Sequence, residues 1–276
     1  MDESVRPKHG SDGGGGVKVV IAGGAGGLGR RLADDAADRG DEVVILTRSR
    51  RPDIIHRQVE WDGRAVGAWA SELAGATVIN LAGELVDRRP TTRNVELLRR
   101  SRVEPTEALV SASSQLPEPP VLWLQMSTLA IYGDAGQDVV DESHPVAEGP
   151  AQMPGVARPW EAAAAGAITE RLVTMRTGIV LDQGTPAFDR LARLTRFGLG
   201  GRISTGDQWI SWIHVDDLLG GGVHVAGVGG GVLGDGLGPQ RCVAARAAGL
   251  PAAGFEVEHP TFDDALADLT GSRSAP

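Results

Sequence analysis

A run of glycines near the amino terminus has the spacing of a phosphate-binding loop. It reads Gly23-Gly24-Ala25-Gly26-Gly27-Leu28-Gly29 and fits both G-x-x-G-x-x-G and G-x-G-x-x-G. Glycines at these positions permit a tight turn and a close approach of the backbone to a pyrophosphate, which the free N–H groups of a following helix then bind. Such a loop alone is a weak signal, because the chain holds 39 glycines.

The residues around the loop favour a binding role over a structural turn. A β-branched run at 17–21 precedes the loop, a helical pattern at 27–39 follows it, and a second β-rich run occupies 42–47. Strand, loop, helix and strand in this order form the unit that binds dinucleotides. We therefore predict that a dinucleotide contacts the loop residues Gly23, Gly26, Gly27, Leu28 and Gly29.

The end of the second β-rich run indicates which dinucleotide is preferred. An NAD site usually places a carboxylate here for the ribose 2′-hydroxyl, but this chain has Arg48, Arg50 and Arg51 instead. A guanidinium matches a 2′-phosphate in charge and geometry. The sequence thus favours NADP(H) over NAD(H), with Arg48 as the first contact. The alternative is three exposed arginines on a loop.

Alternating strand and helix patterns place this unit in a larger fold. Strands are predicted at 76–81, 121–127 and 172–181, and helices at 91–113 and 158–170. Such alternation produces parallel sheets with right-handed crossovers. We predict an α/β protein whose Rossmann-type doubly wound parallel sheet, the dinucleotide-binding domain, covers residues 17–183.

The remaining residues, 184–276, are expected to form a shortened substrate-binding region. The apolar segment 212–218 should pack back on the Rossmann domain. The glycine-rich stretch 220–250 loses much entropy on ordering, so it is expected to be loop-rich and poorly ordered. A short helix is predicted at 263–269.

Composition narrows the classes of partner and location. The net charge of −9 argues against nucleic acid, which basic surfaces bind. No apolar run approaches the ~20 residues of a membrane span. Cys242 is the single cysteine, so no intramolecular disulfide forms and the reducing cytoplasm is expected. Residues 1–16 lack the apolar core of a signal peptide and are expected to be a disordered leader.

Longer motifs give the sequence a family likeness. They include Trp61-Asp62, Asn80 to Glu84, Ser127 to Asp134 (STLAIYGD) and Gln208 to Leu218 (QWISWIHVDDL). On these motifs the chain resembles the atypical epimerase-like group of extended short-chain dehydrogenases/reductases. The resemblance implies further cofactor-binding residues: Asp62 near the adenine, Ser127 beside the nicotinamide, and Asn80, Leu81, Ala82, Gly83 and Arg176. From the residues alone, Asp62 could instead cap a turn and Ser127 could satisfy backbone groups at a strand end.

The sequence departs from the wider superfamily where the acid–base pair is expected. The Tyr-x-x-x-Lys positions fall on Val156 and Trp160, and neither side chain can ionise. A positioned general acid contributes roughly 10²–10⁴-fold to a rate, so another group must supply it if the reaction transfers a proton. The candidate catalytic residues are Thr128, Tyr132, Glu161 and Glu84.

Two functions follow from the resemblance. The first is an NADP(H)-dependent oxidoreductase or epimerase that acts on a small polar metabolite. The second is a catalytically impaired NADPH-binding module that serves as a redox sensor or partner protein. The resemblance also allows a homodimer.

One further motif, His214-Val215-Asp216-Asp217, has residue types that bind metals. Carboxylates at this position also cap the free N–H groups at the start of a helix. We favour the capping role and predict no metal site.

Overall fold

A computed structural model describes residues 16–87, 89–136, 138–148, 153–197, 211–227, 232–234, 244–245 and 256–271. The leader expected at 1–16 lies outside the described residues except for residue 16. No helix among the described residues is both long and apolar enough to cross a bilayer.

The centre of the molecule is a seven-stranded parallel sheet in the order β3-β2-β1-β4-β5-β7-β10. Its strands are β1 (Lys18–Ala22), β2 (Glu42–Thr47), β3 (Arg57–Glu60), β4 (Thr77–Asn80), β5 (Leu122–Thr128), β7 (Leu172–Thr177) and β10 (Val232–Gly234). The order reverses between β1 and β4, where the chain starts building outward in the opposite direction. Ligands of doubly wound sheets bind at this switch point, beyond the carboxyl ends of the strands. The prediction of a Rossmann-type sheet is confirmed.

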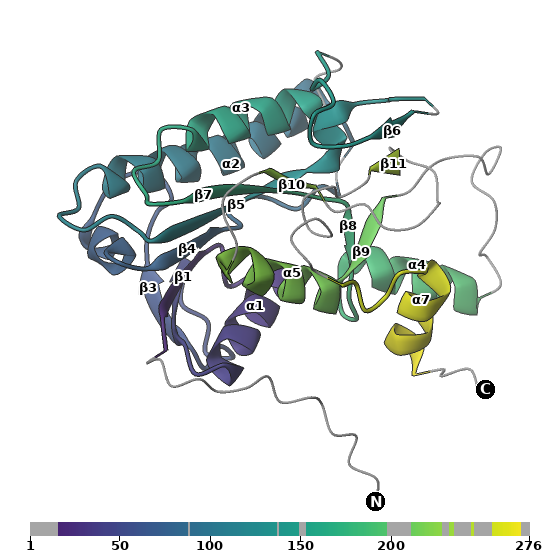
Figure 1. Cartoon of the computed structure of the whole chain (residues 1–276), viewed down its shortest axis with the longest axis horizontal. Coiled ribbons are helices and arrows are strands. Elements are labelled where there is room, and N and C mark those ends of the chain that lie inside the picture. Colours follow the sequence, from purple (N-terminus) through teal and green to yellow (C-terminus); the bar gives the residue numbers. More distant parts are fainter. Residues whose placement is uncertain are drawn as a thin grey trace, which may run out of the picture.

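Helices cover both faces of the sheet (Figure 1). On one face lie α1 (Gly27–Asp38) and α5 (Val215–Gly227), and on the other lie α2 (Thr92–Ser113) and α3 (Pro154–Ala164). Side chains alternate along β1, with Val19 and Ile21 in the core beside α1 and Val20 in the core beside α2. Both faces of each central strand are therefore buried, as parallel strands require.

A smaller unit follows the sheet. The strand expected at 172–181 divides at Gly178, after which β8 (Ile179–Leu181) pairs with β9 (Trp212–His214) in a separate sheet. A Cβ at Gly178 would lie 2.6 Å from the Ser211 carbonyl oxygen, so only glycine permits the division. Helices α4 (Pro186–Arg196) and α7 (Phe262–Thr270) complete a core with Leu181 and Trp212. A third, two-stranded sheet joins β6 (Val139–Val140) and β11 (Ala244–Ala245).

Two expected elements differ from the observed ones. The helix expected at 158–170 is α3, which begins at Pro154, a favourable first-turn residue, and ends at Ala164. The stretch 220–250 is not loop-rich throughout, because α5 continues to Gly227 and Val232–Gly234 forms the edge strand β10. Burial of Val215, and of Leu218 against the main core, outweighs the poor helix propensity of the glycines. The rest of that stretch lies outside the described residues, apart from β11.

Buried amides hold the carboxyl ends of β4 and β5 against α2. Asn80 is fully buried and donates to Thr106 Oγ1 at 2.8 Å and to Gln125 Oε1 at 2.9 Å. Its own oxygen accepts the backbone N–H of Ala82 at 3.2 Å. The side chain of Asn80 thus makes three hydrogen bonds in the interior, and it is the acceptor for the N–H of Ala82.

Removal of this side chain should cost much of the stability of the fold. We expect Asn80→Ala to lower the free energy of unfolding by about 2–4 kcal/mol, because desolvated groups lose their partners. Urea unfolding measures the change. The matched control is Asn94→Ala, since Asn94 makes an exposed hydrogen bond to the Arg89 carbonyl and should change stability by no more than ~0.5 kcal/mol. Equal effects of the two substitutions would contradict the role given to Asn80.

Candidate functional site

A cleft with a volume of about 1190 Å³ opens at the carboxyl ends of β1, β2, β4 and β5. Ligand sites of ordinary size span about 300–1,000 Å³, so this cleft is large enough for an extended ligand. Its walls come from the glycine loop, the segment after β2, the segment after β4, the start of α2 and the end of β5. All of these elements meet at the switch point of the sheet.

The glycine loop has the geometry that an anion requires. Gly23 has a φ of +78°, and Gly29 packs so tightly on the loop that a Cβ would lie 2.5 Å from Gly24 Cα. Gly26 precedes α1 without a side-chain cap, so the first N–H groups of the helix face the cleft without a competing carboxylate or hydroxyl. A Cβ at Gly27 would meet nothing within 4 Å. The predicted residues Gly23, Gly26, Gly27, Leu28 and Gly29 all line the cleft.

The arginines after β2 separate into two groups. Arg48 and Arg51 line the cleft, whereas Arg50 lies 3.7 Å from Glu60 and is not part of the wall. Arg48 is exposed, and its Nη2 lies 3.2 Å from Glu84 Oε1 on the opposite side of the cleft. Two guanidinium groups at the end of β2 are thus available to a phosphate.

Asp62 caps a turn, which is one of the two roles that the sequence allowed, and its place near the adenine stays a prediction. It lines the cleft, and its Oδ1 accepts the backbone N–H groups of Arg64 at 2.8 Å and Ala65 at 2.9 Å. These two hydrogen bonds hold the pKa of the Asp62 carboxyl below its usual value, so the group is ionised at neutral pH.

The segment after β4 was predicted as a whole, but its residues do different things. Leu81, Ala82, Gly83 and Glu84 line the cleft. Asn80 does not, because all of its side chain is buried in the amide network, so its predicted place on the cofactor surface is wrong. It shapes the segment instead, by accepting the N–H of Ala82.

A continuous polar network lies behind the end of β5. Ser127 donates to Glu161 Oε1 at 2.5 Å, and Arg176 binds the same carboxylate through Nε at 2.9 Å and Nη2 at 2.8 Å. The remaining arm of Arg176 donates to the Tyr132 hydroxyl at 2.7 Å. Strands β5 and β7 place Ser127 directly opposite Arg176, and α3 brings Glu161 over both. The structure therefore joins four residues that the sequence singled out separately.

The network has a definite charge arrangement. The paired carboxylate of Glu161 raises the pKa of the Arg176 guanidinium above its usual range. Burial raises the pKa of Tyr132, and the hydrogen bond from Arg176 offsets only part of that effect. Tyr132 is thus neutral and Arg176 is charged at physiological pH.

The candidate catalytic residues divide according to their access to the cleft. Thr128 and Glu84 line it together with Ser127, whereas Tyr132, Glu161 and Arg176 lie behind this wall. Thr128 Oγ1 accepts the N–H of Ala130 at 3.2 Å and caps a 3₁₀ helix, Leu129–Tyr132, so its proton remains free to donate. Ser127 is the member of the polar network that lines the cleft.

Two cleft residues were not assigned a role from the sequence. Arg102 and Trp160 both line the wall beyond β4, and the Arg102 Cζ lies 5.2 Å from the centre of the Trp160 ring. The signal for Arg102 was its spacing on α2, four residues from both Leu98 and Thr106, which are buried on the inner face of the helix. An arginine on that face cannot be a solvated surface residue.

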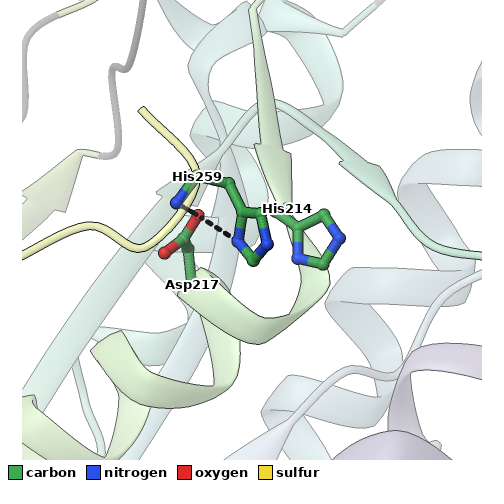
Figure 2. A group of neighbouring side chains, drawn as sticks. All are labelled: His214, Asp217 and His259. Atoms are coloured by element: carbon green, nitrogen blue, oxygen red, sulfur yellow. Dashed lines mark hydrogen bonds and ion pairs between the residues drawn. The ribbon is translucent and has the colours of Figure 1, made fainter. Parts of the chain in front are cut away.

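His214, Asp217 and His259 lie close together at the junction of β9 and α5 (Figure 2). Asp217, in the first turn of α5, accepts the backbone N–H groups of Glu258 at 2.7 Å and His259 at 3.2 Å. The rings of His214 and His259 stack with centroids 3.8 Å apart and an interplanar angle of 28°. A metal ion lies in the plane of each imidazole that binds it, so stacked rings are poorly arranged to share one. The sequence had predicted that Asp217 caps the start of its own helix. In the structure its carboxylate caps the segment leading to α7 instead.

A parallel sheet in this order, with a glycine loop and cleft at its switch point, defines a Rossmann-type dinucleotide-binding protein. The chain belongs to the NAD dependent epimerase/dehydratase family, whose family model matches residues 19–153. The family likeness inferred from the motifs is confirmed.

Individual relatives agree with this assignment. The human epimerase family protein SDR39U1 is 32% identical over 209 residues, which are 74% of this chain and 68% of the relative. The crystal structure of human SDR39U1 (isoform 2) with NADPH has a TM-score of 0.76 and 25% identity, and covers 93% of this chain and 100% of that chain. A nucleoside-diphosphate sugar epimerase from Corynebacterium glutamicum shares the fold, with a TM-score of 0.77, 23% identity, and coverage of 93% and 58%.

Two neighbouring glycines allow the phosphate site to be tested apart from the fold. We expect Gly29→Ala to destabilise the protein by about 1–3 kcal/mol, because the new Cβ meets backbone. Gly27→Ala should leave stability within ~0.5 kcal/mol and weaken dinucleotide binding at least ~10-fold, since its Cβ occupies only the open cleft. Thermal unfolding and calorimetric titration with NADPH measure the two effects. Unchanged NADPH affinity in Gly27→Ala would place the pyrophosphate elsewhere.

Proposed function

We propose that this protein is an NADP(H)-dependent oxidoreductase or epimerase that acts on a small polar metabolite. The observation that carries the proposal is the hydrogen-bonded path from Ser127, in the cleft wall, to the buried Glu161 carboxylate. Such a path gives the cleft a means of moving a proton without the usual tyrosine and lysine. The NADPH of the human SDR39U1 structure supports the choice of cofactor.

The preference for NADP(H) rests on the end of β2. No carboxylate from that segment lines the cleft, whereas Arg48 and Arg51 do. A 2′-phosphate placed between them would gain charge-assisted hydrogen bonds that a 2′-hydroxyl does not make. Glu84, which holds Arg48 at 3.2 Å, keeps that side chain over the cleft.

A dinucleotide held by the glycine loop, Arg48 and Arg51 would supply or accept the hydride of the reaction. When a substrate alcohol is oxidised, its hydroxyl proton passes to Ser127 Oγ as the Ser127 proton passes to Glu161 Oε1, and both return in the reverse direction. Arg176 fixes the carboxylate through two hydrogen bonds, so the acceptor oxygen stays in place during the transfer. Thr128 donates a hydrogen bond from its hydroxyl to the same substrate oxygen.

Tyr132 has a supporting role in this scheme. Its hydroxyl accepts from Arg176, and its pKa is raised, so it does not provide a base near neutral pH. Its oxygen instead holds the third arm of Arg176 and keeps the guanidinium directed at Glu161. Tyr132 is a positioning residue.

The alternative function is a binding module that holds NADPH without turnover. It is favoured by the complete burial of Val156, which stands where the superfamily has its catalytic tyrosine and carries no ionisable group. Firm NADPH binding with no activity against a broad carbonyl panel, and a partner whose affinity differs between NADPH and NADP⁺, would support this alternative.

Substitution of the arginines after β2 tests the cofactor preference. We expect the wild type to bind NADPH at least ~10-fold more tightly than NADH, which is about 1.4 kcal/mol. Arg48→Gln and Arg51→Gln should each reduce that ratio by lowering only the NADPH affinity. Arg50→Gln is the matched control, because Arg50 is directed at Glu60 and is not in the cleft wall. If all three variants keep the ratio, the 2′-phosphate does not bind at the end of β2.

Substitution of Ser127 tests the proton path. We expect Ser127→Ala to lower kcat by roughly 10²–10⁴-fold, with NADPH affinity unchanged, because only proton transfer is lost. NADPH consumption with a panel of aldehydes and ketones provides the assay. Ser111→Ala, which alters an exposed serine of α2 outside the cleft wall, should keep full activity. An active Ser127→Ala enzyme would remove the path from the mechanism.

The pH dependence of kcat tests whether Tyr132 is the base or only a positioning residue. Because the pKa of Tyr132 is raised above its ordinary value of about 10, the residue stays protonated throughout the range below pH 9. Tyr132→Phe should therefore lower kcat by a constant factor at every pH between 6 and 9. A change in the shape of its pH profile would make Tyr132 the titrating group.

A further inference from the structure

Arg102 is a buried cation at the inner wall of the cleft. Only 8% of the residue is exposed, although Arg99 and Arg100 beside it on α2 are solvated. The guanidinium lies over the Trp160 ring and packs against Gly83, where a Cβ would lie 3.0 Å from Cζ. It is therefore held rigidly between the segment after β4 and α3.

The hydrogen bonds of Arg102 leave donors unused. Nη1 donates to the Leu98 carbonyl at 3.2 Å and lies 3.4 Å from Ser101 Oγ, and Nη2 donates to the Glu84 carbonyl at 3.0 Å. Nε is buried and has no partner among the described residues. A guanidinium has five N–H groups, so Nε–H and one Nη2–H remain for an acceptor.

Trp160 offers another unused donor beside Arg102. Its indole Nε1 is buried and also lacks a partner in the described part of the chain. Arg102 and Trp160 both line the cleft, and the guanidinium lies 5.2 Å from the indole ring. Two adjacent side chains that each bury an unpaired N–H are unusual, because such groups normally find acceptors.

The charge of Arg102 is likewise uncompensated. None of the described carboxylates forms an ion pair with it, while Arg64 and Arg100 share Glu104, and Arg48 holds Glu84. Burial lowers the pKa of the Arg102 guanidinium, and the nearby Glu84 carboxylate offsets only part of that effect. A buried charge without a counter-charge destabilises the fold, and a ligand anion would remove that cost.

We propose that Arg102 and Trp160 form the receptor for an anionic group of the substrate, a carboxylate or a phosphate group. The proposal rests on the proposed function, in that it assigns the substrate of that cleft to a chemical class. The phosphates of the cofactor are assigned to the glycine loop after β1 and to Arg48 and Arg51 after β2. The Arg102 guanidinium lies beyond β4, on the opposite side of the switch point, and adjoins the wall that carries Ser127.

The test uses the full chain, saturated with NADP⁺, and two simple anions. Acetate and inorganic phosphate are titrated at constant ionic strength while the arginine Nε–H and tryptophan indole N–H signals are followed by NMR. Acetamide is the neutral match for acetate. We expect both anions, but not acetamide, to shift the Arg102 Nε–H and Trp160 Nε1–H signals in a saturable way, because both donors gain an acceptor. Arg102→Lys and Trp160→Phe assign the two signals by their loss.

Variants then show whether the guanidinium carries the binding. Arg102→Lys keeps a positive charge but not the planar fork, and should weaken acetate binding at the Trp160 indole at least ~10-fold. Arg102→Gln should abolish it. Arg100→Gln is the matched control: this arginine also lines the cleft but is exposed and paired with Glu104, so acetate affinity should be unchanged. NADPH affinity should stay within ~3-fold of wild type in all variants.

Three results would overturn the proposal. One is the absence of any saturable anion shift at Arg102 and Trp160. Another is a shift that persists in Arg102→Gln. The third is a loss of NADPH affinity of at least ~10-fold in both Arg102 variants, which would assign the guanidinium to the cofactor. If the wild type fails to bind NADP⁺, the proposed function fails, yet the same titration of the cofactor-free protein still decides whether Arg102 binds anions.

Discussion

The ion pair between Arg176 and Glu161 is the interaction on which the wall of the cleft depends. It joins strand β7 to helix α3 across the end of β5, and it orients Ser127 on one side and Tyr132 on the other. Both partners are largely buried, with side chains 9% and 17% exposed. Burial of an ion pair costs desolvation that the attraction repays only when the geometry is good and the remaining donors are satisfied. Here Ser127 and Tyr132 complete that satisfaction, so the four residues form one unit.

Arg102 is a second buried cation, and unlike Arg176 it has no carboxylate partner among the described residues. Both guanidinium groups lie near the cleft wall, but Arg176 has a bidentate partner whereas Arg102 binds only neutral oxygens of the protein. The sign of the pKa change follows from this difference, because pairing raises the pKa of Arg176 and burial lowers that of Arg102. Burial of the Arg102 charge therefore costs the fold stability. Such a charge is typical of a group that binds a ligand.

The sequence predicted those features that depend on local pattern. The glycine loop, the arginines after β2 and the order of the sheet follow from spacing along the chain, since each element contributes its own signal. Asn80 was misplaced because the direction of a side chain at a strand end depends on α2, a partner 26 residues away at Thr106. The division of the strand at Gly178 depends on Ser211, and the helical start of the glycine-rich stretch depends on the core around Leu218. Contacts between distant segments decided all three.

In the proposed mechanism, residues other than a tyrosine and a lysine on α3 supply the proton path and the positive charge. Val156 and Trp160 fill the space that those side chains would occupy, and they leave α3 without a titrating group at either position. Glu161, one residue further along α3, lies over β5, where its carboxylate accepts the hydrogen bond of the Ser127 hydroxyl. The positive charge comes from Arg102 of α2. Its guanidinium stacks on the flat ring of Trp160. A tryptophan at that position is thus compatible with a charged cleft, because α2 carries an arginine on its buried face.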